Sequence, residues 1–327
     1  MTHFSKAFRK ALPLTALAAL AIGSHAAPAL AQQSSSASSA TAEAPAMRSR
    51  MMTALTGWEV EQYLARNDVL FVPVGPVEQN GGMPTDVEYV IPLAYAMGLA
   101  EKGDGLVAPY IAYTYPGGTT TSRGTTYVST SDSLPYHKAL VRSWVRQGFR
   151  RIVFLTSHGP SQQTMLPLVR ETFDELHVPV LWMDTGMVRA FTPGEGRPGF
   201  GDGPPNARNL VSFGAYQIAG RLQDIPVNLN QPRHDVARDP SNLSRYVPPF
   251  NGTPAGSFYA DPVLHGGFVE PVTEGQRAQW GAEGADYIRS QVASFDVNAM
   301  LAELRARDEY TRVIEQRYGD LLPGERR

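Results

Sequence analysis

The stretch VLFVPVGPVEQNGGMPTD, residues 69–86, places acidic side chains directly after an apolar run. Glu78 and Asp86 lie in a loop that is broken by proline and glycine, and Asn80 lies between them. Two carboxylates beside a buried strand cost free energy unless another group pairs with them. This loop is therefore a candidate site for a bound cation.

His158 is the third candidate ligand, because it follows another apolar run, RIVFLTS. One imidazole and two carboxylates suit a divalent ion such as zinc or manganese, with one position open to water. Such an ion lowers the pKa of its water to about 7 and polarises a carbonyl, which is enough for hydrolysis at neutral pH. The spacing alone also fits a plainer alternative, in which His158 hydrogen-bonds the backbone at a strand end.

The elements that must position these residues follow from the hydrophobic pattern. Short apolar runs predict buried strands at residues 69–74, 106–113, 151–157 and 178–184. Helical patterns cover residues 87–102, 134–147, 162–176, 210–222, 274–294 and 299–318. This alternation predicts a three-layer α/β/α fold with a mainly parallel sheet. Sites in such sheets lie at the carboxyl ends of the strands, where Glu78 and His158 both fall.

The N-terminal region has the features of an exported protein. Basic residues, the apolar run 12–22 and the small residues ALA at 29–31 predict a signal peptide over residues 1–31. Residues 32–46 are rich in serine and alanine and predict a flexible linker. Residues 47–327 are long enough for one domain with a full core. We therefore expect a periplasmic or secreted protein with no membrane contact after cleavage.

Composition limits the partners and the ligands. The chain has no cysteine, so disulfides are excluded and a metal ion must be held by histidine and carboxylates. The formal net charge is −2 and no basic run is present, which argues against a nucleic-acid partner.

Several stretches resemble the creatininase (creatinine amidohydrolase) family. PVGPVEQNGGMPTD resembles the family loop P-V-G-S-x-E-Q-H-G-x-H-L-P-L-x-T-D, and GFRRIVFLTSHGPSQQ resembles its G-F-(R/K)-x-(I/V)-x-x-x-N-G-H-G-G-N strand and turn. RGTTYVSTSDSL and GGFVEPVTEGQRAQWGAEGADYI match further family segments in the same order. The resemblance spans about residues 55–292. It implies a layered α/β amidohydrolase that forms a homo-oligomer and hydrolyses C–N bonds of cyclic or linear amides.

The resemblance also implies a metal centre that is reduced in this chain. Members hold two adjacent divalent ions, and the ligands of the first correspond to Glu78, Asp86 and His158, which are all present. At the second ion, the family histidine falls on Asn80 and an acidic ligand falls on Pro160. The family segment H-A-G-E-x-E-T-S aligns with PPNARNLV, residues 204–211, which has neither the histidine nor the glutamates. We therefore expect one divalent ion per chain, with the second metal site lost.

Other residues are candidates for catalysis. Asn80 or Gln162 could hydrogen-bond a developing oxyanion, and His265 in a glycine-rich loop could supply a replacement imidazole. No general base is identified, and Glu88 and Asp202 are the only candidates for that role. His137 lies in a helical run and is predicted to lie on the surface or on a helix face.

We therefore predict an exported, metal-dependent amidohydrolase that acts on a small amide. An alternative stays open. The same losses at the second metal position fit a non-hydrolytic, creatininase-like protein that binds a small ligand, or that catalyses a different reaction, with a degenerate metal site.

Overall fold

Four parallel strands form the central sheet of the computed structural model, which describes residues 47–111, 113–121, 123–190, 207–230, 256, 258 and 271–324. The strands are β1 (Val69–Pro73), β2 (Leu106–Val107), β3 (Arg151–Thr156) and β4 (Val180–Asp184), in the order β2-β1-β3-β4. The predicted signal peptide and linker, residues 1–46, lie outside the described residues, and so does His265. The predicted domain boundaries therefore stay predictions.

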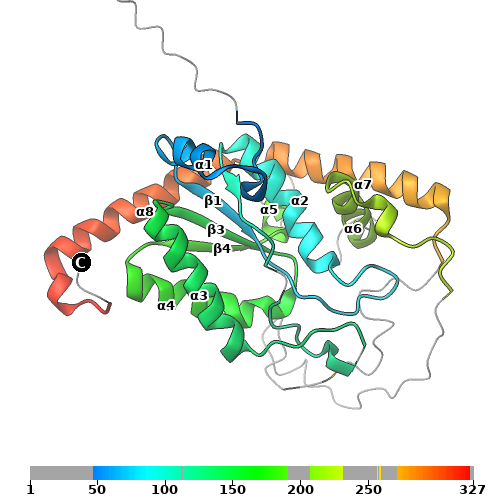
Figure 1. Cartoon of the computed structure of the whole chain (residues 1–327), viewed down its shortest axis with the longest axis horizontal. Helices are drawn as coiled ribbons and strands as arrows, with labels where there is room; N and C mark the ends of the chain where they lie inside the picture. The colour runs from blue at the N-terminus through cyan, green and yellow to red at the C-terminus, as the bar shows by residue number, and fades with distance from the viewer. Residues whose placement is uncertain are drawn as a thin grey trace, which may run out of the picture. The chain divides into compact units, whose positions relative to one another are not determined.

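Helices cover both faces of this sheet (Figure 1). Val69 and Phe71 of β1 point to one face, where they belong to a core with α2 (Val87–Lys102), α6 (Ala207–Ile218), α7 (Glu274–Ser294) and α8 (Val297–Tyr318). Leu70 and Val72 point to the other face, toward α1 (Gly57–Leu64), α3 (Thr130–Gln147) and α4 (Gln162–Leu176). Since alternate strand residues face opposite sides, continuous apolar runs are what a sheet covered on both faces requires. The predicted three-layer α/β/α fold is confirmed.

Several element boundaries differ from the sequence prediction, and two of these differences have a clear local reason. Helix α3 begins at Thr130 rather than Leu134, because the Ser129 hydroxyl accepts a hydrogen bond from the Asp132 amide at 3.1 Å and caps the helix. Strand β2 ends at Val107 rather than continuing to residue 113, because Pro109 has no N–H to donate. The loop that follows β2 is therefore longer than predicted.

Helices α6 and α7 pack at unusually short range through two glycines. A Cβ atom on Gly284 of α7 would lie 1.9 Å from the Leu210 carbonyl oxygen of α6. A Cβ atom on Gly214 of α6 would lie 2.0 Å from the Gly284 carbonyl carbon. The absence of side chains at both positions therefore allows α6 and α7 to pack closely against each other.

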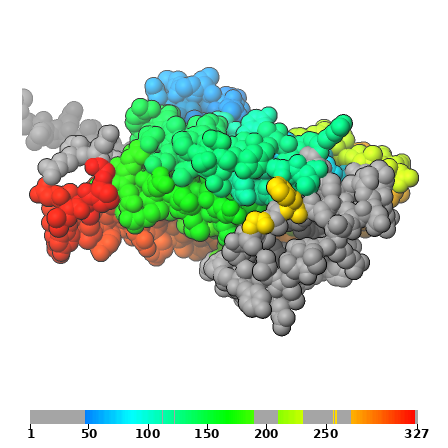
Figure 2. Space-filling model, turned by 90° about the horizontal axis from the view of Figure 1, so that it is seen from below, coloured from blue at the N-terminus to red at the C-terminus, as the bar shows by residue number. Residues whose placement is uncertain are grey.

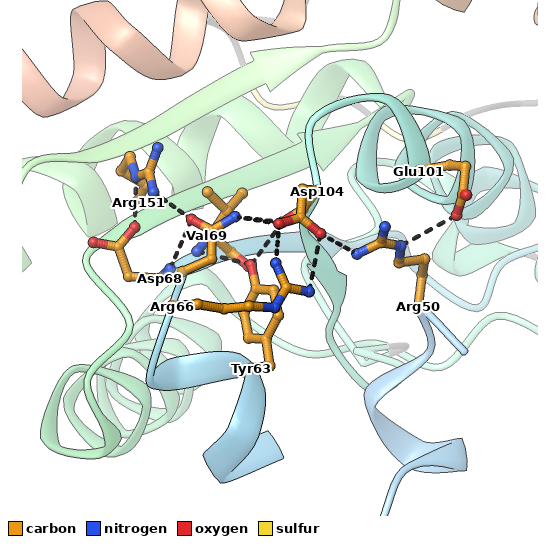
Figure 3. A network of polar contacts seen from close by, with 9 residues as sticks. Arg50, Tyr63, Arg66, Asp68, Val69, Glu101, Asp104 and Arg151 are labelled. Carbon is orange, nitrogen blue, oxygen red and sulfur yellow. Dashed lines mark hydrogen bonds and ion pairs between the residues drawn. The ribbon is translucent and has the colours of Figure 1, made fainter. Parts of the chain in front are cut away.

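A network of charged side chains lies at the amino ends of the strands (Figure 3). The Asp104 carboxylate accepts hydrogen bonds from Arg50, Arg66 and Asn67, and its carbonyl oxygen accepts one from the Tyr63 hydroxyl at 3.0 Å. Asp104 itself has a φ of +48°, which is uncommon for a residue other than glycine. This network lies at the opposite end of the strands from the loop that carries Glu78.

Helices α3 and α4 form an outer face beside the C-terminal part of α8 (green and red in Figure 2). His177, the C-cap residue of α4, contacts α8: its Nδ1 lies 2.5 Å from Oε1 of Glu315.

Among the helices in the described part of the chain, none combines the length and the apolar composition that a membrane span requires.

Candidate functional site

Glu78 and His158 meet at the carboxyl ends of two neighbouring strands. Glu78 follows β1 and His158 follows β3, which pair directly in the sheet. Both side chains are buried, with 0% of Glu78 and 4% of His158 exposed. Oε1 of Glu78 lies 3.4 Å from Nε2 of His158. The structure therefore brings two of the three predicted ligands together.

Each member of this pair is held from its other side by a hydroxyl group. The Thr119 hydroxyl donates to Oε2 of Glu78 at 2.6 Å. Nδ1 of His158 lies 2.9 Å from the Ser161 Oγ, in the turn that opens α4. Partners of this kind orient metal ligands and fix the tautomer of a ligating histidine.

The separation within the pair fits a shared metal ion better than a hydrogen bond. An N–H···O hydrogen bond has a donor–acceptor distance of about 2.9 Å, so 3.4 Å is long. Two ligands that each lie about 2.1 Å from a tetrahedral ion are roughly 3.4 Å from each other. However, among the residues that the structure describes, no three His, Cys, Asp or Glu side chains are grouped closely enough to hold a metal ion. Glu78 and His158 thus fit as two ligands of an ion whose third ligand is not in place.

Asp86, the third predicted ligand, is bound elsewhere. Its Oδ1 accepts a hydrogen bond from the Tyr216 hydroxyl at 2.5 Å, and its Oδ2 accepts one from the Arg221 guanidinium at 2.6 Å. This differs from the predicted ligand set because residues of α6 and of the chain just after it occupy both carboxylate oxygens.

The groups around Asp86 all keep their protons at neutral pH. Burial, and then the hydrogen bond to Asp86, raises the pKa of the Tyr216 hydroxyl. Burial lowers the pKa of Arg221, but its hydrogen bonds to Asp86 and Asp224 outweigh that effect, so the pKa is raised overall. Burial, followed by the charge of Asp86, raises the pKa of Tyr89 to about 12. Asp86 is therefore surrounded by proton donors and one cation.

Glu88 is a carboxylate that contacts residues near both members of the Glu78–His158 pair in the sequence. Its Oε1 accepts a hydrogen bond from the Asn80 side chain at 3.1 Å, and Asn80 follows Glu78 by two positions. Its Oε2 accepts one at 3.2 Å from Ser157, the residue before His158. Glu88 is buried, with 6% of its surface exposed. A Cβ atom on Gly75 would lie 2.3 Å from the Glu88 carbonyl oxygen, so the first turn of α2 rests directly on the end of β1.

Comparison with known proteins agrees with this architecture. Residues 53–200 match the Creatininase family, described as creatinine amidohydrolase. A creatinine amidohydrolase of Pseudomonas putida is 33% identical over 111 residues, which are 32% of this chain and 43% of that enzyme. Residues 53–200 of the chain are therefore similar to the creatininase family.

Solved creatininase structures share its fold. A tryptophan-to-phenylalanine mutant creatininase superimposes with a TM-score of 0.51 and 20% identity, over 78% of this chain and 99% of that one. A glutamate-to-glutamine mutant creatininase complexed with creatine gives a TM-score of 0.50 and 19% identity, over 83% of this chain and 99% of that one. The aligned segment of the Pseudomonas enzyme covers less than half of its length.

The family loop that this sequence resembles has a spacing that bears on Glu88. In the family loop, the acidic residue follows the proline of L-P-L-x-T-D by four positions. Glu88 follows Pro84 by four positions, whereas Asp86 follows it by two. The letters T-D therefore favour Asp86, whereas the spacing from the proline favours Glu88, so the motif alone leaves both acids as candidates.

Three further residues, Asn80, Gln162 and His265, were predicted to take part in catalysis. Asn80 is buried, and its amide is used by Glu88 rather than being directed at an open position. Gln162 begins α4 directly after Ser161 and is half-buried. The oxyanion role of both residues stays a prediction, as does that of His265, which lies outside the described residues.

His137 is buried inside the domain rather than lying on the surface. It is 0% exposed, and neither ring nitrogen has a hydrogen-bond partner among the described residues. Burial lowers the pKa of His137 to about 4. Its ring is therefore neutral in the folded protein.

Proposed function

We propose that the protein is an exported hydrolase that cleaves a C–N bond of a small cyclic or linear amide. The observation that carries this proposal is the buried contact between Glu78 and His158, 3.4 Å apart at the carboxyl edge of a creatininase-type sheet. The predicted signal peptide supports export to the periplasm or beyond.

The residues that would hold a divalent ion are Glu78, His158 and Glu88. We assign the third place to Glu88 because its carboxylate is linked to the neighbours of both other ligands, Asn80 and Ser157. Zinc and manganese both suit one imidazole with two carboxylates. When bound, such an ion lowers the pKa of a water molecule to about 7 and polarises the amide carbonyl.

The chain's own residues prepare this chemistry. Ser161 holds the ring of His158, and Thr119 holds the second oxygen of Glu78, so neither ligand must reorganise. Burial of the pair excludes bulk water, which strengthens electrostatic interactions at the site.

We also propose that the protein works as a homo-oligomer, which light scattering of the purified protein would test.

One observation favours a second function. Among the described residues no third ligand is grouped with Glu78 and His158, as expected for a degenerate site that binds a small ligand without hydrolysis. Under this alternative, the purified protein would bind little zinc or manganese and would not turn over amides.

The deciding experiment measures metal and turnover on the same samples. The full chain is expressed with its leader, and the processed protein is loaded with zinc or manganese and analysed by elemental mass spectrometry. A panel of small cyclic amides and formamides is then tested for hydrolysis. We expect close to one equivalent of metal, and both Glu78→Gln and His158→Ala should lose the metal and the turnover.

Glu101→Gln is the matched control, since Glu101 is an exposed glutamate paired with Arg50 at the far end of α2. It should keep the metal and the activity. Turnover that is unchanged in Glu78→Gln would overturn the proposed hydrolase.

A further inference from the structure

Asp86 stands at the N-cap of α2 without capping it. An aspartate at this position normally accepts a hydrogen bond from the backbone of the first turn. Here the side chain makes no capping bond, and both oxygens are used by residues more than a hundred positions away in the sequence. The carboxylate of Asp86 thus binds side chains that are distant in the sequence instead of the backbone of its own helix.

The partners of Asp86 are themselves fixed in place. Tyr216 is 0% exposed in α6, and the guanidinium of Arg221 lies over its ring at 5.3 Å. Nε of Arg221 also donates to Asp224 at 2.7 Å. Asp86 therefore binds a preorganised pair of donors, and the hydrogen bond to Arg221 is charge-assisted.

Asp86 and Glu88 point in opposite directions from the same helical turn. Each residue of an α-helix rotates by about 100° from the one before, so residues two positions apart face nearly opposite sides. Accordingly, Asp86 contacts α6, whereas Glu88 contacts Asn80 and Ser157 beside the Glu78–His158 pair. While the first turn of α2 keeps its conformation, the side chain of Asp86 cannot take the position of the Glu88 side chain.

The turn between them is rigid. The Asp86 carbonyl oxygen accepts hydrogen bonds from the amides of Tyr89 at 2.9 Å and Val90 at 3.0 Å. The backbone at Glu88 also sits directly on Gly75, with no room for a side chain between them. A displacement of Asp86 would therefore move the backbone of Glu88.

We propose that Asp86 is a positioning residue and not a metal ligand: by binding Tyr216 and Arg221, it fixes the first turn of α2 and thereby the backbone from which the Glu88 side chain extends. This inference rests on the proposed function, in which Glu88 completes the site. It follows that α6 and Arg221 are coupled to the reaction through Asp86 and the first turn of α2.

The test compares Asp86→Asn, Arg221→Gln and Glu88→Gln. Bound zinc is measured by competition with a chelator, and kcat and KM are measured on the amide found in the screen. We expect Asp86→Asn and Arg221→Gln to keep close to one equivalent of zinc while kcat falls about 10- to 100-fold, as for a small misplacement of a reacting group. Glu88→Gln should lose zinc. The double variant Asp86→Asn/Arg221→Gln should be no slower than the slower single variant, because both changes break one contact.

Asp286→Asn is the control, since Asp286 forms an exposed ion pair with Arg289 on α7, and in the described part of the chain no hydrogen bond or ion pair joins it to Asp86 or Arg221. Its kcat should stay within about twofold of the parent. A merely structural role of Asp86 would lower the melting temperature and the folded fraction without changing kcat per folded, zinc-loaded molecule, and that result would overturn the proposal. Zinc loss in Asp86→Asn as complete as in Glu78→Gln would also overturn it. Full zinc retention and activity in Glu88→Gln would instead overturn the proposed site.

Discussion

Glu78 and His158 approach to 3.4 Å, and each is held from behind by a hydroxyl group, that of Thr119 or Ser161. This arrangement orients both groups toward the space between them. Partners of metal ligands typically contribute 10- to 100-fold to metal affinity or activity.

Thr119→Val and Ser161→Ala should therefore each weaken zinc binding by about 10- to 100-fold while the fold is kept. The measurement is a zinc titration with a competing chelator, with circular dichroism as the check on folding. Ser133→Ala is the control, because the Ser133 hydroxyl lies 3.3 Å from Thr164 and contacts neither member of the pair. Equal zinc affinity in all three variants would contradict the role of the hydroxyls.

Gly75→Ala should displace the first turn of α2. The added Cβ atom would lie 2.3 Å from the Glu88 carbonyl oxygen, and backbone atoms cannot rotate away as a side chain can. We expect a loss of about 1–3 kcal/mol in the free energy of unfolding, measured in urea, together with weaker zinc binding. Gly57→Ala should stay within about 0.5 kcal/mol of the parent, since nothing lies within 4 Å of its Cβ position.

His137 should make the fold sensitive to mild acid. Burial lowers its pKa to about 4 in the folded protein, whereas an unfolded histidine has a pKa of about 6.5. The unfolded chain therefore binds this proton more tightly, and the free energy of unfolding falls as the pH drops from 6.5 toward 4. The contribution of His137 to this loss should be about 2 kcal/mol between pH 7.5 and pH 5.

The check is the urea midpoint of His137→Leu against the parent at both pH values. The variant should lose less stability on acidification by about that amount. Tyr136→Phe, a change at the exposed neighbour whose ring lies 5.6 Å from that of His137, should follow the parent. Parallel pH profiles for His137→Leu and the parent would show that the imidazole titrates normally.

Asp104→Ala should destabilise the fold without affecting the site. The change removes the acceptor shared by Arg50, Arg66 and Asn67, and it leaves alanine at a φ of +48° (Figure 3). Because the carboxylate is 42% exposed, we expect a loss of only about 2 kcal/mol in the free energy of unfolding. Zinc affinity should not change, since the network lies at the amino ends of the strands.

Asp286→Ala provides the comparison for Asp104→Ala. Asp286 forms an exposed pair with Arg289 on α7, and its loss should cost less than about 0.5 kcal/mol. A similar small cost for Asp104→Ala would mean that the network of Asp104 contributes no more than a surface ion pair.

Much of the fold could be predicted from periodicity. The helices at residues 87–102, 162–176 and 274–294 have the bounds that the sequence pattern indicated. The pairing of Glu78 with His158 could also be predicted, since the carboxyl ends of adjacent parallel strands meet at one edge. Strand β2 was overestimated because an apolar run does not show where a proline interrupts the ladder.

The sequence by itself determined the layered fold and the two residues that meet at its edge, because those depend on local patterns and on strand order. It did not decide which of two acids, Asp86 or Glu88, faces that edge. Side chains two positions apart in a helix point in nearly opposite directions. Which acid faces the edge therefore depends on how the first turn of α2 packs against the end of β1. Only the tertiary structure settles this, through Gly75 beneath the turn and Arg221, 135 residues further along the chain, which binds Asp86.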